Sequence, residues 1–210
     1  MCIRDRTRNI ETVSYEEAVE LAYKGASVIH PRAVEIAFDS NIPLHILSLT
    51  KDNGTLVRNI KSDKPVTGIS SKKDIILVRI AVDPDNVYNS GIKIFPILAE
   101  KGISVDFIDI RQDSINFVID SEKEEITAEL LKINDFKFEL QSDLIKISVV
   151  GAGMTGQPGI IAKIVQALHF HNISIHECTD SRTTISCLID KNKEIEALQA
   201  LHNTFELEKQ

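Results

Sequence analysis

The chain has 210 residues, of which 43% are hydrophobic, and a formal net charge of −7. This length suits one large domain or two small ones. The negative charge argues against a nucleic-acid partner, which normally meets a basic face. No apolar run approaches the roughly 18 residues of a membrane-spanning helix, so a membrane partner is not expected either. Three cysteines without a familiar disulfide spacing favour a reducing, cytoplasmic location.

The first residues of the chain predict a helix with a defined beginning. Residues 1–6 (MCIRDR) differ in character from the rest of the chain, and we interpret them as a non-native start. Ser14 and Glu17 have the spacing of a capping box, in which the serine caps the helix and the glutamate bonds back to it. Gly25 is a typical helix stop. We therefore expect a helix between these positions.

The rest of the N-terminal piece predicts a second helix and a hairpin. Pro31 suits the first turn of a helix over residues 31–39. Residues 44–49 indicate a strand, and residues 52–54 (DNG) a turn. A piece of this size is too short to hold a good core of its own. We interpret residues 1–60 as the end of a larger domain and the polar segment 61–65 (KSDKP) as a linker.

The second part of the chain is an internal repeat. Residues 75–131 and 145–201 align at an offset of seventy positions without a gap, and most matches are apolar. The main pairs are Ile75/Ile145, Ile94/Ile164, Leu98/Leu168, Ile103/Ile173, Ile115/Ile185, Ile119/Ile189 and Leu131/Leu201. Two copies are too few for a solenoid, so they indicate two sibling modules, a type of pair that often binds a ligand where its members meet.

Each copy predicts the order strand, helix, strand, strand, helix, strand. The first copy is expected to place these elements at residues 75–82, 90–101, 103–110, 114–119, 123–132 and 136–140, with Pro96 kinking or shortening its first helix. The second is expected to place strands at 145–150, 173–179, 183–189 and 205–207. This βαββαβ pattern is the ferredoxin-like module of the α+β class.

The helices of the second copy have predicted buried faces. A helix opened by Pro158 is expected to bury an apolar stripe, and a final helix is expected to do the same. The expected stripes are Ile160, Ile161, Ile164, Val165 and Leu168 in the first of these helices, and Ile195, Leu198 and Leu201 in the second.

A glycine pattern, Gly151, Gly153 and Gly156, lies between a predicted strand and a predicted helix. This is the context of a dinucleotide-binding fingerprint, and Glu177 lies near the distance of a ribose contact. We reject this interpretation, because the next two strands look adjacent and antiparallel, whereas a Rossmann unit alternates strand and helix. The loop is better interpreted as a helix N-terminus whose N–H groups suit a carboxylate.

Histidines and cysteines of the second copy give no recognised metal or catalytic pattern. His169, His171 and His176 lack the spacing of a metal site and are expected to be solvated or partly packed. Cys178 and Cys187 lie on neighbouring predicted strands, and small buried hydrophobes are favoured over a redox pair. Neither a P-loop nor a Ser-His-Asp arrangement can be assembled, so no catalytic residue is assigned.

Several segments resemble the C-terminal half of the aspartate kinase family, which carries tandem ACT domains. The resemblance runs from about residue 11 to the end of the chain, and its motifs occur in the family's order. They are 13–18 (VSYEEA), 25–32 (GASVIHPR), 41–43 (NIP), 54–57 (GTLV), 66–70 (VTGIS), 149–154 (VVGAGM), 157–159 (QPG) and 201–207 (LHNTFEL). The resemblance implies the end of an α/β amino-acid-kinase domain over residues 1–60, a first ACT domain over 66–141 and a second over 142–210.

The resemblance also implies feedback control. The family phosphorylates the β-carboxylate of aspartate with ATP and magnesium, in the lysine, threonine and methionine pathways, and its ACT pair binds an end-product amino acid. The family's nucleotide and aspartate motifs do not occur in this sequence, so the chain is expected to bind no cofactor and to be inactive alone. It would need a kinase domain or catalytic subunit as partner, either as a gene fragment or as a natural regulatory subunit.

By position in the family's motifs, fourteen residues are expected to bind the effector. An effector carboxylate is expected near the helix start at Asn89, Ser90 and Gly91, and its amine near Asp85 or Asp106. The other first-copy residues are Val105, Arg111 and Gln112. In the second copy they are Gln157, Gly159, Ile160, His176, Ser181 and Arg182.

Departures from the family pattern bear on the effector. Tyr88 and Asn89 replace the family's Pro-Gly at the first helix start, which puts the first ligand loop in question. Residues 180–186 (DSRTTIS) and 102–108 (GISVDFI) look closer to the isoform of spore-forming Gram-positive bacteria that senses meso-diaminopimelate than to the branch that senses lysine or threonine. Many members also end in a strand that returns to the first ACT domain; in this sequence that strand is expected to be either missing or supplied by residues 205–207.

Two other functions are weighed against a regulatory portion of an aspartate kinase. A free-standing ACT sensor that docks on another enzyme has no use for the kinase-like segment around His30 and Pro31. A dinucleotide-binding enzyme would bind NAD. In the preferred interpretation the ACT domains pair side by side in a homodimer, because this covers exposed strand edges.

Overall fold

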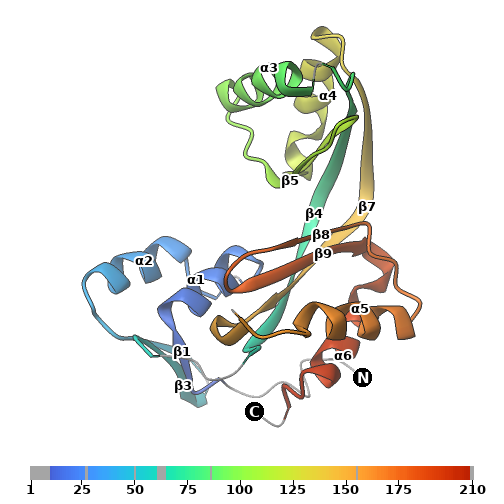
Figure 1. Cartoon of the computed structure of the whole chain (residues 1–210). Coiled ribbons are helices and arrows are strands. Elements are labelled where there is room, and N and C mark those ends of the chain that lie inside the picture. Colours follow the sequence, from blue (N-terminus) through green and yellow to red (C-terminus); the bar gives the residue numbers. More distant parts are fainter. Residues whose placement is uncertain are drawn as a thin grey trace. The chain divides into compact units, whose positions relative to one another are not determined.

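The computed structural model describes residues 10–26, 28–49, 51–60, 65–85, 87–154 and 156–208, without the side chains of 51–53, 87 and 88. The expected non-native start and all but Pro65 of the expected linker lie outside these ranges. The chain divides into two compact units, Met1–Lys72 with Lys146–Gln210, and Lys73–Ile145. Figure 1 shows the elements of both, coloured along the sequence.

The N-terminal piece is a small sheet with two helices. It contains β1 (Thr12–Ser14), α1 (Tyr15–Tyr23), α2 (Pro31–Asp39), β2 (Leu44–Ser48) and β3 (Lys51–Arg58). The strand order is β1-β3-β2, with β1 parallel and β2 antiparallel to β3. The predicted capping box is confirmed: the Ser14 side chain accepts from the Glu17 N–H, and the Glu17 carboxylate accepts from the Ser14 N–H. The predicted helix at residues 31–39 is confirmed too.

The turn predicted at residues 52–54 is wrong, because these residues lie within β3. Gly54 serves another purpose there. A Cβ atom at this position would meet the backbone oxygen of Ile46 on the neighbouring strand at 2.4 Å. The ladder between β2 and β3 shifts register between Ile46 and Ser48, opposite this glycine. A glycine inside a strand often marks such a close approach of two backbones rather than a turn.

Six buried side chains form a core in this piece. They are Val13, Tyr15, Ala18, Val34, Ala37 and Val57. They come from β1, both helices and β3, so the helices cover the sheet with their apolar faces. The ring of Tyr15 also meets the ring of Phe38 edge to face, with centroids 5.5 Å apart.

The two copies of the repeat share a six-stranded sheet with the order β5-β6-β4-β7-β9-β8. Its two long strands are β4 (Gly68–Ala81) and β7 (Lys137–Val150), each of 14 residues. The sequence predicts two separate strands at 136–140 and 145–150, but β7 runs through both without a break. It therefore ends the first copy and begins the second.

The unit Lys73–Ile145 contains the first copy. After β4 come α3 (Val87–Glu100), β5 (Asp106–Ile110), β6 (Ser114–Asp120), a 3-10 turn (Ser121–Lys123) and α4 (Glu124–Ile133). This is the predicted βαββαβ order, and α3 continues through Pro96 rather than ending there. The helices α3 and α4 lie side by side (Figure 1). Their residues Ile94, Leu98 and Leu131 pack with β4 and β6 into one core.

The second copy lies in the other unit. After β7 come a 3-10 turn (Ala152–Met154), α5 (Ile160–Phe170), β8 (Glu177–Asp180), β9 (Thr184–Asp190), another 3-10 turn (Lys191–Lys193) and α6 (Glu194–Thr204). The antiparallel pairing of β8 with β9 confirms the prediction. The strand expected at residues 205–207 is wrong. Glu206 has a φ of 51°, and the N–H of Leu207 bonds back to the oxygen of His202, so these residues close the helix instead.

Burial confirms the repeat. Both members of six of the seven main apolar pairs are buried, with at most 5% exposure, and the seventh pair joins buried Ile115 to half-buried Ile185. The predicted stripe of α5 is only partly right, because Ile161 and Val165 are 45% and 44% exposed. The helix buries Ala167 instead, a residue whose small side chain gives a weak apolar signal. The predicted stripe of α6 is partly wrong in the same way, because Ile195 is exposed whereas the small residues Ala197 and Ala200 are buried.

Across the described residues, every helix falls short of the length and apolar character needed to cross a bilayer.

Candidate functional site

An open cavity of about 670 Å³ lies between the start of α5 and the hairpin of β8 and β9. We call it the α5 cavity. Its volume falls within the usual range of small-molecule sites. Five of the six effector residues expected in the second copy line it: Gln157, Gly159, Ile160, Ser181 and Arg182. The structure thus brings together residues that are more than twenty positions apart in the sequence.

The start of α5 supplies backbone donors to this cavity. Gly159 is the N-cap residue, with a left-handed φ of 93°, and the first hydrogen bond of the helix runs from Lys163 N–H to its oxygen. The N–H groups before Lys163 have no partner within the helix. Together with the helix dipole they favour a negative group at this end. A Cβ atom at Gly159 or Gly156 would meet nothing within 4 Å, so both glycines are needed for their backbone angles.

The opposite wall of the cavity is a tight hairpin with a fixed turn. Ser181 N–H donates to the Thr184 oxygen at 2.8 Å, which leaves Arg182 and Thr183 as the two turn residues. The Thr183 oxygen accepts from Gly151 N–H at 2.8 Å, and the Thr184 hydroxyl donates to Glu20 of α1 at 3.0 Å. The turn is therefore held by the loop after β7 on one side and by α1 on the other. This helix belongs to the N-terminal piece, β1 to β3, which is called the kinase-like piece below.

Charges of both signs border the cavity. Asp180 ends β8, Arg182 follows two residues later, and both line the cavity with exposed side chains. A carboxylate and a guanidinium at one cavity match the two charges of a free amino acid, whose ammonium pairs with the former and whose carboxylate with the latter. Cys178 and Thr179 of β8 complete this wall.

The eight effector residues expected in the first copy lie in the unit Lys73–Ile145. The helix start expected near Asn89–Gly91 lies slightly earlier, because α3 begins at Val87 and these residues lie in its first turns. Arg111 donates to Asp109 at 2.6 Å, and Asp106 accepts from the N–H of Phe107. Asp85 donates its N–H to Asp83 in a local turn. Val105 is half-buried and Gln112 exposed.

Two histidines of the second copy have carboxylate partners. His176 is not among the residues that line the α5 cavity, and its Nε2 is 2.8 Å from Asp190 Oδ1. His171 lies 3.5 Å from Glu196. Among the described residues, no three His, Cys, Asp or Glu side chains gather in a way that could hold a metal ion.

Sequence reasoning identified Glu17 as a helix-capping residue but missed its second role. Its side chain is buried at 1% exposure. One carboxylate oxygen accepts from Ser14 N–H at 3.1 Å and the Ser14 hydroxyl at 2.9 Å, and the other from the Thr67 hydroxyl and from Ala152 N–H at 3.1 Å. Burial alone would raise the pKa of Glu17, but these hydrogen bonds outweigh it and hold the pKa below its usual value.

The glycine after β7 explains why Ala152 comes so close. A Cβ atom at Gly151 would meet the backbone oxygen of Pro65 at 2.2 Å. Thr67 N–H also donates to the Val150 oxygen at 2.7 Å. Gly151 is therefore needed because two backbones pack there, and not because a phosphate must approach. This supports the rejection of the dinucleotide fingerprint.

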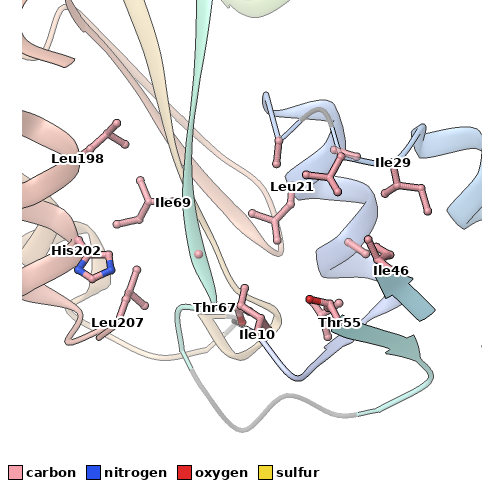
Figure 2. Close-up of a pocket in the computed structure, with 16 residues that line it drawn as sticks. Ile10, Leu21, Ile29, Ile46, Thr55, Thr67, Ile69, Leu198, His202 and Leu207 are labelled. Atoms are coloured by element: carbon pink, nitrogen blue, oxygen red, sulfur yellow. The ribbon is translucent and has the colours of Figure 1, made fainter. Parts of the chain in front are cut away.

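Two further pockets border the kinase-like piece. A pocket of about 360 Å³ is mostly apolar (Figure 2). Leu198, His202 and Leu207 face it from α6 and the turn after it, and Leu21 and Ile46 face it from the kinase-like piece. Such a lining offers no pair of opposite charges to a zwitterion.

The other pocket, of about 510 Å³, lies against α1 and α2 and is lined by four acidic residues and two arginines. Its basic residues are Arg32, which pairs with Glu35 at 3.3 Å, and Arg182 of the hairpin turn. Arg182 thus lines both this pocket and the α5 cavity.

The duplicated βαββα core and its cavity define an ACT-type regulatory protein joined to a piece of an amino acid kinase. A family model of the ACT domain matches residues 147–205, and one of the amino acid kinase family matches residues 3–48. Aspartokinase 1 of Bacillus subtilis is 36% identical over 214 residues, which cover 98% of this chain and 53% of that protein. The chain is a homologue of the aspartokinases and contains the regulatory ACT region of that family.

Solved structures agree with this assignment. The aspartate kinase of Clostridium acetobutylicum has a TM-score of 0.85 and 27% identity, over 94% of this chain and 49% of that one. The regulatory subunit of aspartate kinase from Thermus thermophilus has a TM-score of 0.62 and 28% identity, over 68% of this chain and 99% of that one. The chain spans about half the length of the curated relatives it matches.

Proposed function

We propose that this chain is the regulatory portion of an aspartate kinase and that an end-product amino acid binds in the α5 cavity. One observation carries the proposal: five effector residues expected from the family's motifs line a single cavity in the second copy. The amino acid carboxylate would bind the N–H groups at the start of α5 and Arg182. Its ammonium group would bind Asp180. Both charges of the ligand are then paired, as a site that removes them from water requires.

The effector proposed first is meso-diaminopimelate, with lysine and threonine as the alternatives. The segments 102–108 and 180–186 support it, because they resemble the isoform that senses this compound. Calorimetric titration of the chain with these three amino acids, and with NAD as a fourth ligand, tests the proposal. Saturable binding of one amino acid supports it. Binding of NAD alone, or of none of the four, contradicts it.

Two matched variants locate the site. Arg182→Gln should weaken amino acid binding by about tenfold or more, since a charge-assisted hydrogen bond contributes roughly 1.5–3 kcal/mol. Arg111→Gln makes the same change at the hairpin of the first copy, where the arginine already pairs with Asp109. Weakening by Arg111→Gln alone would place the effector in the first copy, and equal weakening by both variants would contradict a site confined to the second copy.

The catalytic part of the proposal concerns a whole aspartate kinase. Catalysis would come from a kinase domain or subunit that this chain regulates, so the chain alone should show no aspartate-dependent consumption of ATP. Mixing it with a separately produced kinase domain should give activity that the effector inhibits. If the two parts neither associate nor respond to the effector, the chain is better explained as a free-standing sensor. A cytoplasmic location, expected from the cysteines, belongs to the same proposal.

We further propose a homodimer formed through the ACT sheet. The strands β5 and β8 end the strand order, and end strands present unpaired hydrogen-bonding groups that a second copy can cover. The apolar side chains of Ile108 and Ile110 on β5 are 53% and 55% exposed, which supports an interface at that strand. Sedimentation at several concentrations tests this, and a monomer that persists at all of them would rule the dimer out.

A further inference from the structure

The hairpin beside the α5 cavity carries two thiols that face each other. Cys178 lies on β8 and Cys187 on β9, directly opposite in the ladder. Their Sγ atoms are 3.5 Å apart. Cys187 is buried at 2% exposure, whereas Cys178 is exposed and lines the cavity. The expectation that both are buried hydrophobes is therefore right for Cys187 and wrong for Cys178.

The position of the two cysteines in the ladder suits a covalent bond between them. Ser181 and Thr184 form a hydrogen-bonded pair at the turn. Pairs of the two kinds alternate along an antiparallel ladder, so Cys178 and Cys187, three steps further on, form a non-hydrogen-bonded pair. Such pairs have Cα atoms about 4.5 Å apart and their side chains close together. This separation lies within the range of about 4.4–6.8 Å found in disulfides.

We propose that Cys178 and Cys187 are a redox-active pair that forms a reversible intrachain disulfide with a small-molecule disulfide as oxidant. The exposed Cys178 thiolate attacks one sulfur of the oxidant, forms a mixed disulfide and releases one thiolate. The Cys187 sulfur, losing its proton, then attacks the Cys178 Sγ and expels the second thiolate. Two protein thiols become one disulfide, and one oxidant molecule becomes two thiols.

Exposure and acidity give the two cysteines different roles. The hydrogen bond with Cys187 lowers the pKa of the Cys178 thiol, while the same contact and burial raise the pKa of Cys187. Reaction with an external disulfide needs an accessible thiolate, so Cys178 is the attacking residue. Cys187 is protected from the solvent and reaches only the sulfur beside it, which makes it the resolving residue.

The site is independent of the effector proposal, although the two share a wall. Cys178 lines the α5 cavity, so a bond to Cys187 would fix this side chain against the sheet and change the lining of the cavity. Formation of the disulfide needs no amino acid, and binding of an amino acid needs no oxidation. The two proposals can therefore fail separately.

The test is oxidation of the full chain with oxidised glutathione, followed by unfolding, alkylation and peptide mapping by mass spectrometry. The expected product is a pair of peptides joined between Cys178 and Cys187, two hydrogen atoms lighter than the two free peptides, which dithiothreitol separates again. Cys187→Ala should stop at a glutathione adduct on Cys178, and Cys178→Ala should leave Cys187 unreacted in the folded chain. A stable glutathione adduct on Cys178 in the unaltered chain, a link from Cys178 or Cys187 to a second chain, or persistence of both as free thiols would each overturn the proposal.

Discussion

Glu17→Gln should destabilise the unit that contains the second copy by about 3 kcal/mol. The carboxylate accepts four hydrogen bonds, two from Ser14, one from Thr67 and one from Ala152 N–H. A glutamine has the same shape but only one acceptor oxygen, so its amide nitrogen must face a buried donor on one side. A buried donor left without a partner costs roughly 1–3 kcal/mol, and the remaining bonds lose the contribution of the charge, about 1 kcal/mol each.

Urea unfolding measures this loss as a lower midpoint at an unchanged slope. Glu16→Gln is the matched control, because the neighbouring glutamate is exposed and the substitution should change stability by less than about 0.5 kcal/mol. A double-mutant cycle with Thr67→Val should find about 1 kcal/mol of coupling to Glu17, since the two side chains share a hydrogen bond. If Glu17→Gln is as mild as Glu16→Gln, the buried carboxylate does not hold these segments together and the reasoning is refuted.

Three further outcomes are expected in the same unfolding experiments. The folded-state pKa of Glu17 is depressed, so the stability that its charge provides is complete at neutral pH and is lost as the pH falls below about 4.3. The difference in unfolding free energy between the unaltered chain and Glu17→Gln should therefore narrow at low pH. Gly151→Ala should cost about 3 kcal/mol, because its Cβ would overlap the Pro65 oxygen. Gly159→Ala should cost about 1–2 kcal/mol, from backbone strain alone. Similar costs for the two substitutions would contradict the steric argument. Leu201→Ala should cost about 2–5 kcal/mol because the side chain is fully buried, and a loss below about 1 kcal/mol would mean that the core can collapse around it.

Elements whose signals are local were predicted well from the sequence. The capping box of Ser14 and Glu17 and the proline that begins α2 act through neighbouring backbone groups, so their spacing alone defines them. The repeat was equally informative, because Leu131 and Leu201 occupy the same buried position in both copies. Sequence reasoning also selected five of the residues that line the α5 cavity.

Features that depend on tertiary pairing were missed. The polar residues 141–143 look like a break between strands, but β7 continues through them because its backbone is hydrogen-bonded in the sheet. The Gln141 side chain also accepts a hydrogen bond from Arg79 of β4. Gly54 looks like a turn residue until the neighbouring strand is known. The second role of Glu17 needs Ala152, which is 135 positions away in the sequence. Side-chain spacing carries no signal for partners that only the fold brings together.

The continuity of β7 across the two units has a practical consequence for dissecting this protein. The units divide at Lys72/Lys73 and at Ile145/Lys146, and both points lie inside 14-residue strands rather than in loops. Domain truncation normally cuts through a flexible connection and leaves each half intact. Here separation of the two units severs both strands in mid-ladder and exposes backbone groups that invite aggregation. Internal substitutions, rather than deletions, are therefore the appropriate way to assign tasks to each copy.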